Sequence, residues 1–149
     1  TGQINQPTIT SINLHTSLPG NVHEFGKELR IDFKVELTQD EENLALAYQI
    51  IDEFQVPITH IWKFDAETNI NREKGNYMFS CILEKTKLYI GSYSLRVYLT
   101  NSRTKMKYHY IDTTCDFSVE MVRNTRSDYK WVKGTCKYIE DSKWEIEKI

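Results

Sequence analysis

The sequence feature that most constrains the fold is the alternating stretch at residues 91–100. Large apolar side chains occupy every second position of this stretch, which are Tyr93, Leu95, Val97 and Leu99. The positions between them carry Ser94, Arg96, Tyr98 and Thr100. A period of two is that of a β-strand with one face in a core and the other face available. A guanidinium and a phenol on the available face indicate that this face does more than keep the protein soluble.

Other segments of the chain also have the period or the composition of strands. They are residues 8–14, 28–37, 44–51, 58–64, 76–83, 108–119 and 136–149. The clearest alternation is that of residues 28–37, whose charged side chains alternate with large apolar ones. No segment has an apolar stripe at helical spacing longer than two turns. The pattern predicts an all-β chain, an antiparallel β-sandwich of about eight strands.

The length of 149 residues is typical of one domain with a real core, so we expect a single β-sandwich domain over residues 1–149. Residues 1–7 are expected to form an N-terminal tail or linker, and residues 120–133 an irregular connector. A last strand is expected within residues 134–149, around Trp144 and Ile146. A strand so far along the chain from its sheet can pair within its own subunit or exchange into a neighbouring subunit of a homodimer.

Charge and composition exclude several classes of partner. The net charge of −2 argues against nucleic acid as the main partner, because phosphate binding requires a cationic surface. Residues 123–133 are basic and aromatic, and we interpret them as a linker rather than as a nucleic-acid site. No apolar run reaches the ~20 residues that cross a bilayer, and the first residues do not show a charged segment followed by an apolar one, the pattern of a signal peptide. We therefore expect a cytoplasmic location without direct membrane insertion.

Motifs for catalysis, cofactors and metals are also missing. The chain has no G-x-x-x-x-G-K-[ST] phosphate loop and no G-x-S-x-G elbow, so neither an ATPase nor a serine hydrolase is expected. The histidines are scattered, and the three cysteines show no C-x-x-C spacing, which favours reduced thiols over a metal site or disulfides. A pair of carboxylates for glycoside cleavage, such as Asp112 with Asp116, is a weak signal. We expect no catalytic residue, no metal and no cofactor.

Several short sequence patterns, each present once, follow one another along the chain. These are FGKELRI at residues 25–31, Asp52 at the end of a strand, NYMF at 76–79, LYIGSYSL at 88–95, DFSV at 116–119, Gly134 and Trp144. Their order and spacing resemble the C-terminal domain of Wzt, the nucleotide-binding subunit of ABC transporters that export O-antigen polysaccharide. The resemblance covers about residues 8–149. One departure is the turn at residues 52–55, where the family often has Asp-x-x-Gly and this chain has Asp-Glu-Phe-Gln.

The resemblance implies a fold, a ligand and partners. It implies an immunoglobulin-like sandwich that binds the modified non-reducing end of the exported polysaccharide without catalysis. It also implies a homodimer with an exchanged C-terminal strand. The full-length protein would carry a separate ATPase domain and bind a transmembrane transporter subunit. The alternative is a structural dimerisation or docking domain of a polysaccharide-biosynthesis or glycosyltransferase protein, with no small ligand.

The outward faces of residues 44–51, 93–100 and 108–116 are the predicted ligand site. In an immunoglobulin-like order these strands are neighbours in one sheet. Small side chains are expected to leave a depression for a sugar ring, while tyrosines offer ring faces and polar side chains offer directed hydrogen bonds. The predicted patch comprises Ala45, Ala47, Gln49, Arg96, Tyr98, Tyr110, Asp112 and Thr114, with His60 and Trp62 as bordering residues whose face the pattern leaves open. The other interpretation is that the tyrosines and Arg96 form ordinary cross-strand pairs or lie under the exchanged strand.

Overall fold

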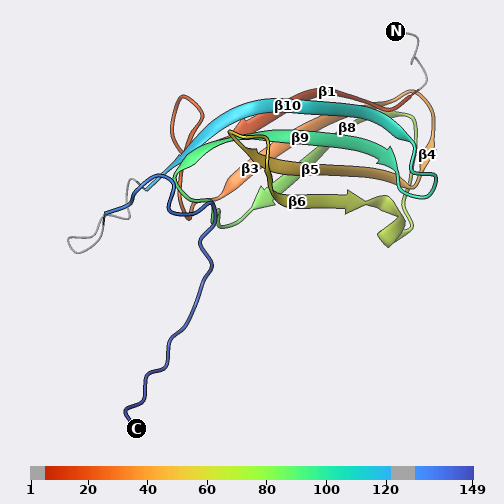
Figure 1. Ribbon diagram of the computed structural model, residues 1–149. Helices are drawn as coiled ribbons and strands as arrows, with labels where there is room; N and C mark the ends of the chain where they lie inside the picture. The colour runs from red at the N-terminus through yellow and green to blue at the C-terminus, as the bar shows by residue number, and fades with distance from the viewer. Residues whose placement is uncertain (1–5, 122–129) are drawn as a thin grey trace.

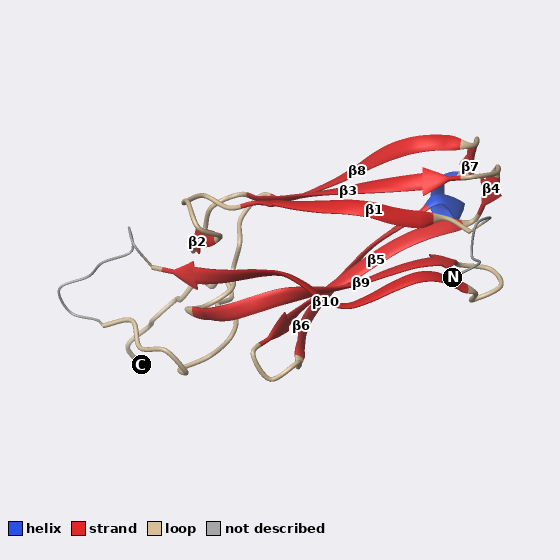
Figure 2. Ribbon diagram, turned by 90° about the horizontal axis from the view of Figure 1, so that it is seen from above, coloured by secondary structure: helices blue, strands red, loops and turns tan. Residues whose placement is uncertain are grey.

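Two β-sheets packed face to face make up most of the described chain in the computed structural model (Figures 1 and 2), which describes residues 6–121 and 130–149. The strands follow the predicted segments closely, and a short 3₁₀ helix, η1, interrupts them. In chain order the elements are β1 (Thr8–His15), β2 (Val22–Glu24), β3 (Leu29–Leu37), β4 (Glu41–Glu42), β5 (Leu44–Asp52), β6 (Pro57–Phe64), η1 (Asp65–Thr68), β7 (Asn71–Arg72), β8 (Gly75–Leu83), β9 (Gly91–Asn101) and β10 (Lys107–Glu120).

The sheet order is that of an immunoglobulin-like sandwich. One sheet has the order β1-β3-β8 and the other the order β2-β10-β9-β5-β6, and β4 pairs with β7 in a small separate ribbon. Figure 2 shows the two sheets as separate layers, with the helix η1 near one end. The long strands pair antiparallel, whereas the short β2 lies parallel to β10. The predicted fold class is therefore confirmed, and β5, β9 and β10 are neighbours as expected.

The core lies between the sheets and is built from the alternating apolar positions. Side chains of β3 and β9 that face each other across the sandwich are at most 1% exposed, among them Ile31, Phe33, Leu95, Val97 and Leu99. Each large aliphatic or aromatic side chain buried in this way contributes about 1.5–3 kcal/mol relative to exposure. The period of two thus fixes which face of each strand turns inward.

Strand β5 departs from the alternation, because both of its faces are covered. Ala45 and Ile51 point away from the core side, yet they are 1% and 0% exposed. A central strand lies between two neighbours, so larger side chains on β6 and β9 can cover small ones on it. This covered face of β5 forms part of the candidate site.

The C-terminal segment forms no last strand in the single chain, which leaves the prediction of an exchanged strand untested. Residues 142–149 form no strand, and Trp144 and Ile146 are 85% and 94% exposed. Nearer the body of the domain, Leu88 and Tyr138 form an isolated bridge, and the Tyr89 N–H donates to the Lys137 carbonyl over 2.9 Å. Figure 1 shows the rest of the segment running away from the sandwich. A strand forms only where its backbone finds a partner, and here none is adjacent.

Two expected segments lie outside or partly outside the described residues. The N-terminal tail at 1–7 is described only from residue 6, and the connector at 120–133 is not described at residues 122–129. Among the described residues, no helix has the length and apolarity needed to span a bilayer.

His23 of β2 is a fully buried histidine held in its neutral form. Its Nδ1 accepts a hydrogen bond from the Ser17 N–H over 3.1 Å, and its Nε2 lies 3.0 Å from the Lys27 carbonyl oxygen, which can only accept. The ring therefore carries its proton on Nε2. Burial, the largest influence, lowers the pKa of His23 below its ordinary value of 6.5. A second proton on Nδ1 would remove the acceptor that Ser17 uses.

We expect the free energy of unfolding to fall as the pH drops below about 6.5, because the unfolded chain then binds a proton at His23 that the folded chain does not. One such group gives a slope of at most ~1.4 kcal/mol per pH unit, down to the lowered pKa of the folded state. Urea unfolding between pH 7.5 and 5.5 measures it. His23→Gln should be less stable at every pH but show a shallower dependence; an unchanged slope would assign the effect to other groups.

Candidate functional site

The surface of the five-stranded sheet that faces away from β1, β3 and β8 is named here the outer face. Strand register places most of the predicted site residues on it. Ala47 lies opposite Trp62 on one side and Tyr98 on the other, and Gln49 lies opposite His60 and Arg96. Tyr98 in turn lies opposite Tyr110 of β10. The predicted residues that lie close to one another on the outer face are Ala45, Ala47, Gln49, His60, Trp62, Arg96, Tyr98, Tyr110 and Asp112.

Aromatic rings form a nearly continuous layer across the outer face. The Tyr98 and Tyr110 ring centroids are 5.1 Å apart, and the His60 ring lies 5.8 Å from Trp62 and 6.5 Å from Tyr98. Strand β5 separates β6 from β9, and two strand spacings amount to about 9.6 Å. Because the His60 and Tyr98 rings approach more closely than that, they lean towards each other over β5. His60 and Trp62 therefore belong to the face rather than to its border.

The leaning rings correct one prediction about this surface. Ala45 and Ala47 were expected to form an open depression, but they are only 1% and 9% exposed. The side-chain oxygen Oε1 of Gln49 is also buried, without a hydrogen-bond partner. The alanines act as a floor on which the neighbouring rings lie. Contact with a ligand is left to the rings themselves, of which Trp62 and Tyr110 are 54% and 44% exposed.

A polar cluster borders the aromatic layer around Arg96. The Nε of Arg96 lies 3.3 Å from the Asp112 carboxylate oxygen Oδ1, and its Nη2 donates to Gln55 Oε1 over 3.2 Å. Tyr110 donates its hydroxyl hydrogen to the same Asp112 oxygen over 2.8 Å. This hydrogen bond is the main reason that the pKa of Tyr110 is raised, so the phenol stays neutral. The cluster holds a carboxylate, a guanidinium and an amide in fixed relative positions.

Thr114 is turned away from the outer face, which contradicts its predicted position. The register between β10 and β9 shifts between Ile111 and Thr114, as at a β-bulge, and Thr114 lies opposite Leu95, a fully buried core residue. An extra residue in one strand reverses the alternation beyond it. Thr113 takes the outward position instead, and its hydroxyl donates to Gln55 Oε1 over 3.1 Å.

Three residues of the site were missing from the predicted patch: Gln55, Thr113 and Phe64. Phe64 follows the same alternation as Trp62, and their ring centroids are 6.1 Å apart. Gln55 has no sequence signal. It occupies the turn position where the resembling family often has glycine, and it adopts the left-handed conformation there, with φ 66°. Its side chain reaches Arg96 and Thr113, which a glycine could not do.

The chemistry of the outer face is that of recognition. Exposed aromatic ring faces pack against apolar ligand surfaces, and fixed carboxylate, amide and guanidinium groups make directed hydrogen bonds. Across residues 6–121 and 130–149, no three His, Cys, Asp or Glu side chains are grouped so that they could hold a metal ion.

Comparisons with known proteins agree with the fold. The crystal structure of the C-terminal domain of Wzt matches with a TM-score of 0.72 and 14% identity, over 96% of this chain and 85% of that one. A Niemann-Pick type C2 protein from the Japanese carpenter ant matches with a TM-score of 0.51 and 8% identity, over 77% of this chain and 93% of that one. No curated protein sequence matches the chain. The family model of the Wzt C-terminal domain matches residues 5–137, and the chain belongs to that family.

Proposed function

We propose that the outer face is a non-catalytic binding site for an O-antigen-type polysaccharide, which it recognises at the modified non-reducing end for export by an ABC transporter. The observation that carries the proposal is the layer of His60, Trp62, Tyr98 and Tyr110 rings beside the Arg96 cluster. Membership of the Wzt C-terminal domain family supports the same function. In this proposal the ATPase lies in a separate domain of the full-length protein.

The geometry suggests how a sugar would be held. Trp62 and Tyr110 present ring faces to the C–H groups of a pyranose, since they are 54% and 44% exposed. The Asp112 side chain is 69% exposed, whereas that of Arg96 is 16% exposed. Arg96 therefore fixes the carboxylate, and the carboxylate accepts hydrogen bonds from sugar hydroxyls. Polar groups already fixed in position lose less entropy when a ligand binds.

We expect Tyr98→Ala and Arg96→Ala each to weaken polysaccharide binding by about 1–3 kcal/mol, or roughly 5- to 150-fold. Tyr98→Ala removes the central ring of the layer, and Arg96→Ala leaves Asp112 held by Tyr110 alone. Titration calorimetry with the O-polysaccharide of the protein's own host measures both. Lys34→Ala, on the exposed face of β3 in the other sheet, is the matched control and should bind like the parent. If both site variants fold and bind as the parent does, the site lies elsewhere.

The second candidate function is a structural dimerisation or docking domain without a small ligand. The observation that favours it is the C-terminal segment, whose Trp144 and Ile146 side chains are almost fully exposed. The same calorimetric titration distinguishes the two candidate functions. A binding module shows saturable affinity for the polysaccharide, and a docking domain shows none.

Dimerisation is also compatible with polysaccharide binding, and we infer that the chain forms a homodimer through its C-terminal segment. Large apolar side chains so exposed on a segment without strand pairing are typical of a surface that a partner covers. An exchanged segment makes the same contacts in a neighbouring subunit as it would make in its own subunit, so the exchange costs little free energy. The proposed setting is the cytoplasmic side of the membrane, where the full-length protein binds a transmembrane transporter subunit.

A further inference from the structure

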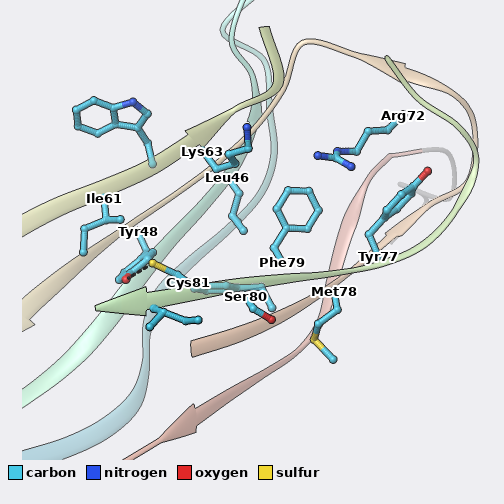
Figure 3. Close-up of a pocket in the computed structure, with 13 residues that line it drawn as sticks. Leu46, Tyr48, Ile61, Lys63, Arg72, Tyr77, Met78, Phe79, Ser80 and Cys81 are labelled. Carbon is cyan, nitrogen blue, oxygen red and sulfur yellow. Dashed lines mark hydrogen bonds between the residues drawn. The ribbon is translucent and has the colours of Figure 1, made fainter. Parts of the chain in front are cut away.

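A separate feature of the fold is a slot that opens between the two sheets where their edge strands β6 and β8 face each other. Its main cavity has a volume of about 430 Å³. Phe33, Leu46 and Tyr48, one strand in from each edge, form its floor, and Ile61 and Phe79 form its walls. Figure 3 shows Leu46, Tyr48, Ile61 and Phe79 among the side chains that line this cavity between the strands. Cavities of this size with apolar walls are typical of small-molecule sites.

One end of the slot is closed by a fixed ion pair. Arg72 binds both carboxylate oxygens of the buried Asp65, over 2.6 and 2.9 Å, and its guanidinium carbon lies 4.9 Å from the Phe79 ring centroid. The charge of Arg72 is thereby neutralised within the protein. At the other end of the cavity, the Tyr48 hydroxyl lies 3.2 Å from Cys81 Sγ (Figure 3). Burial raises the pKa of Tyr48, so its phenol is neutral and the floor carries no charge.

The slot is elongated rather than round. A second cavity of about 200 Å³ shares Ile61 with the first and continues past Ile58 of β6 and Leu83 of β8. The apolar lining therefore continues along β6 and β8 in the same direction. Sugar hydroxyls placed among these side chains would lose their hydrogen bonds, which excludes the polysaccharide as the occupant. A linear apolar chain fits both the shape and the chemistry.

Three lysines line the slot, and two of them, Lys85 and Lys87 beside the second cavity, are already ion-paired with Glu140 or Asp141. The third lysine, Lys63, complements an acidic head group. Lys63 lines the main cavity opposite Leu46, is exposed, and has no ion-pair partner among the described residues. We propose that the slot binds a single-chain anionic amphiphile, with its head group at Lys63 and its hydrocarbon chain running past Ile61 towards Ile58 and Leu83. This site is distinct from the outer face and goes beyond the proposed binding of polysaccharide.

Dodecanoate, titrated below its micelle concentration and followed by calorimetry, is the probe. We expect saturable binding of one dodecanoate per chain. Ile61→Trp fills the slot and should weaken binding at least ~10-fold, while Glu36→Trp, which adds the same ring on the exposed face of β3, should leave it unchanged. Absence of saturable binding, or equal binding by Ile61→Trp, would overturn the proposal.

Neutral dodecanol tests the role of the charge. Lys63→Gln should weaken dodecanoate binding about 5-fold and leave dodecanol binding unchanged, because only the carboxylate pairs with the ammonium. The lysine is exposed, so this variant should fold even if Ile61→Trp does not. Equal weakening of both probes would contradict the head-group position. Binding that appears only after residues 142–149 are removed would show that a second copy of the chain fills the slot, and would also overturn the proposal.

Discussion

Replacing Arg72 by alanine is expected to lower the free energy of unfolding by about 3–5 kcal/mol. The residue pairs with Asp65, which begins η1 and is only 1% exposed. Without the guanidinium, a carboxylate is left buried and unpaired, which costs far more than the loss of an exposed ion pair. Arg72 also packs against the Tyr77 and Phe79 rings, at 5.3 and 4.9 Å from their centroids, so its removal leaves a gap.

Urea unfolding of the parent and the variant measures this loss. The control is the double variant Asp65→Leu with Arg72→Met, which removes both charges and keeps apolar volume. It should be more stable than Arg72→Ala alone, since no unpaired charge stays behind. A loss below about 1 kcal/mol for Arg72→Ala would mean that water reaches Asp65 and that the pair contributes no more than a surface ion pair.

If the chain forms the proposed homodimer, removal of residues 142–149 is expected to convert it into a monomer. The remaining chain keeps the bridge between Leu88 and Tyr138 and the hydrogen bond from the Ile139 N–H to the Lys87 carbonyl. It also keeps the ion pairs of Lys87 with Glu140 and Asp141. The truncated domain should therefore stay folded, while the exposed Trp144 and Ile146 side chains are lost.

Light scattering on the intact and the truncated chain reports their masses directly. The double variant Trp144→Ala with Ile146→Ala separates apolar contacts from backbone pairing, and should weaken the dimer without changing chain length. Lys143→Ala is the control within the same segment and should leave the mass unchanged. A monomeric mass for the intact chain, across the concentrations used for binding, would end the proposal of exchange.

The alternation of apolar residues predicted most of the fold because a strand's period is a local property. Large apolar residues alternate along residues 29–37 and 91–99, and their inward side chains are at most 3% exposed. The same reasoning does not settle the C-terminal segment, where a strand-like composition has no adjacent backbone to pair with in the single chain. Strand formation there depends on a partner that no local pattern specifies.

The candidate site was predicted in part, for equally physical reasons. Alternation placed Arg96, Tyr98 and Tyr110 on one face, and strand order brought them beside Gln49. It could not predict the shift in register after Ile111, which exchanges the roles of Thr113 and Thr114. Nor could it predict the leaning of His60 and Tyr98 over the alanines, which depends on the rotamers of side chains from different strands.

The turn after β5 shows how a departure from the family pattern can add to a site. Asp52 Oδ1 accepts hydrogen bonds from the Phe54 and Val56 N–H groups, over 2.8 and 3.0 Å, and so holds the turn. Gln55 takes the left-handed conformation that glycine adopts more readily. In exchange, its amide oxygen accepts hydrogen bonds from Arg96 and Thr113. The missing glycine therefore gives the polar cluster an additional member.

The most direct test of polysaccharide binding at the outer face is an NMR titration of the ¹⁵N-labelled chain, together with its Trp indole signals, with the O-polysaccharide of its own host. The account predicts that chemical shifts change on β5, β6, β9 and β10 around Trp62, Tyr98 and Tyr110. Signals of β1, β3 and β8 should stay in place. Shift changes confined to the other sheet, or no change at saturating polysaccharide, would contradict it.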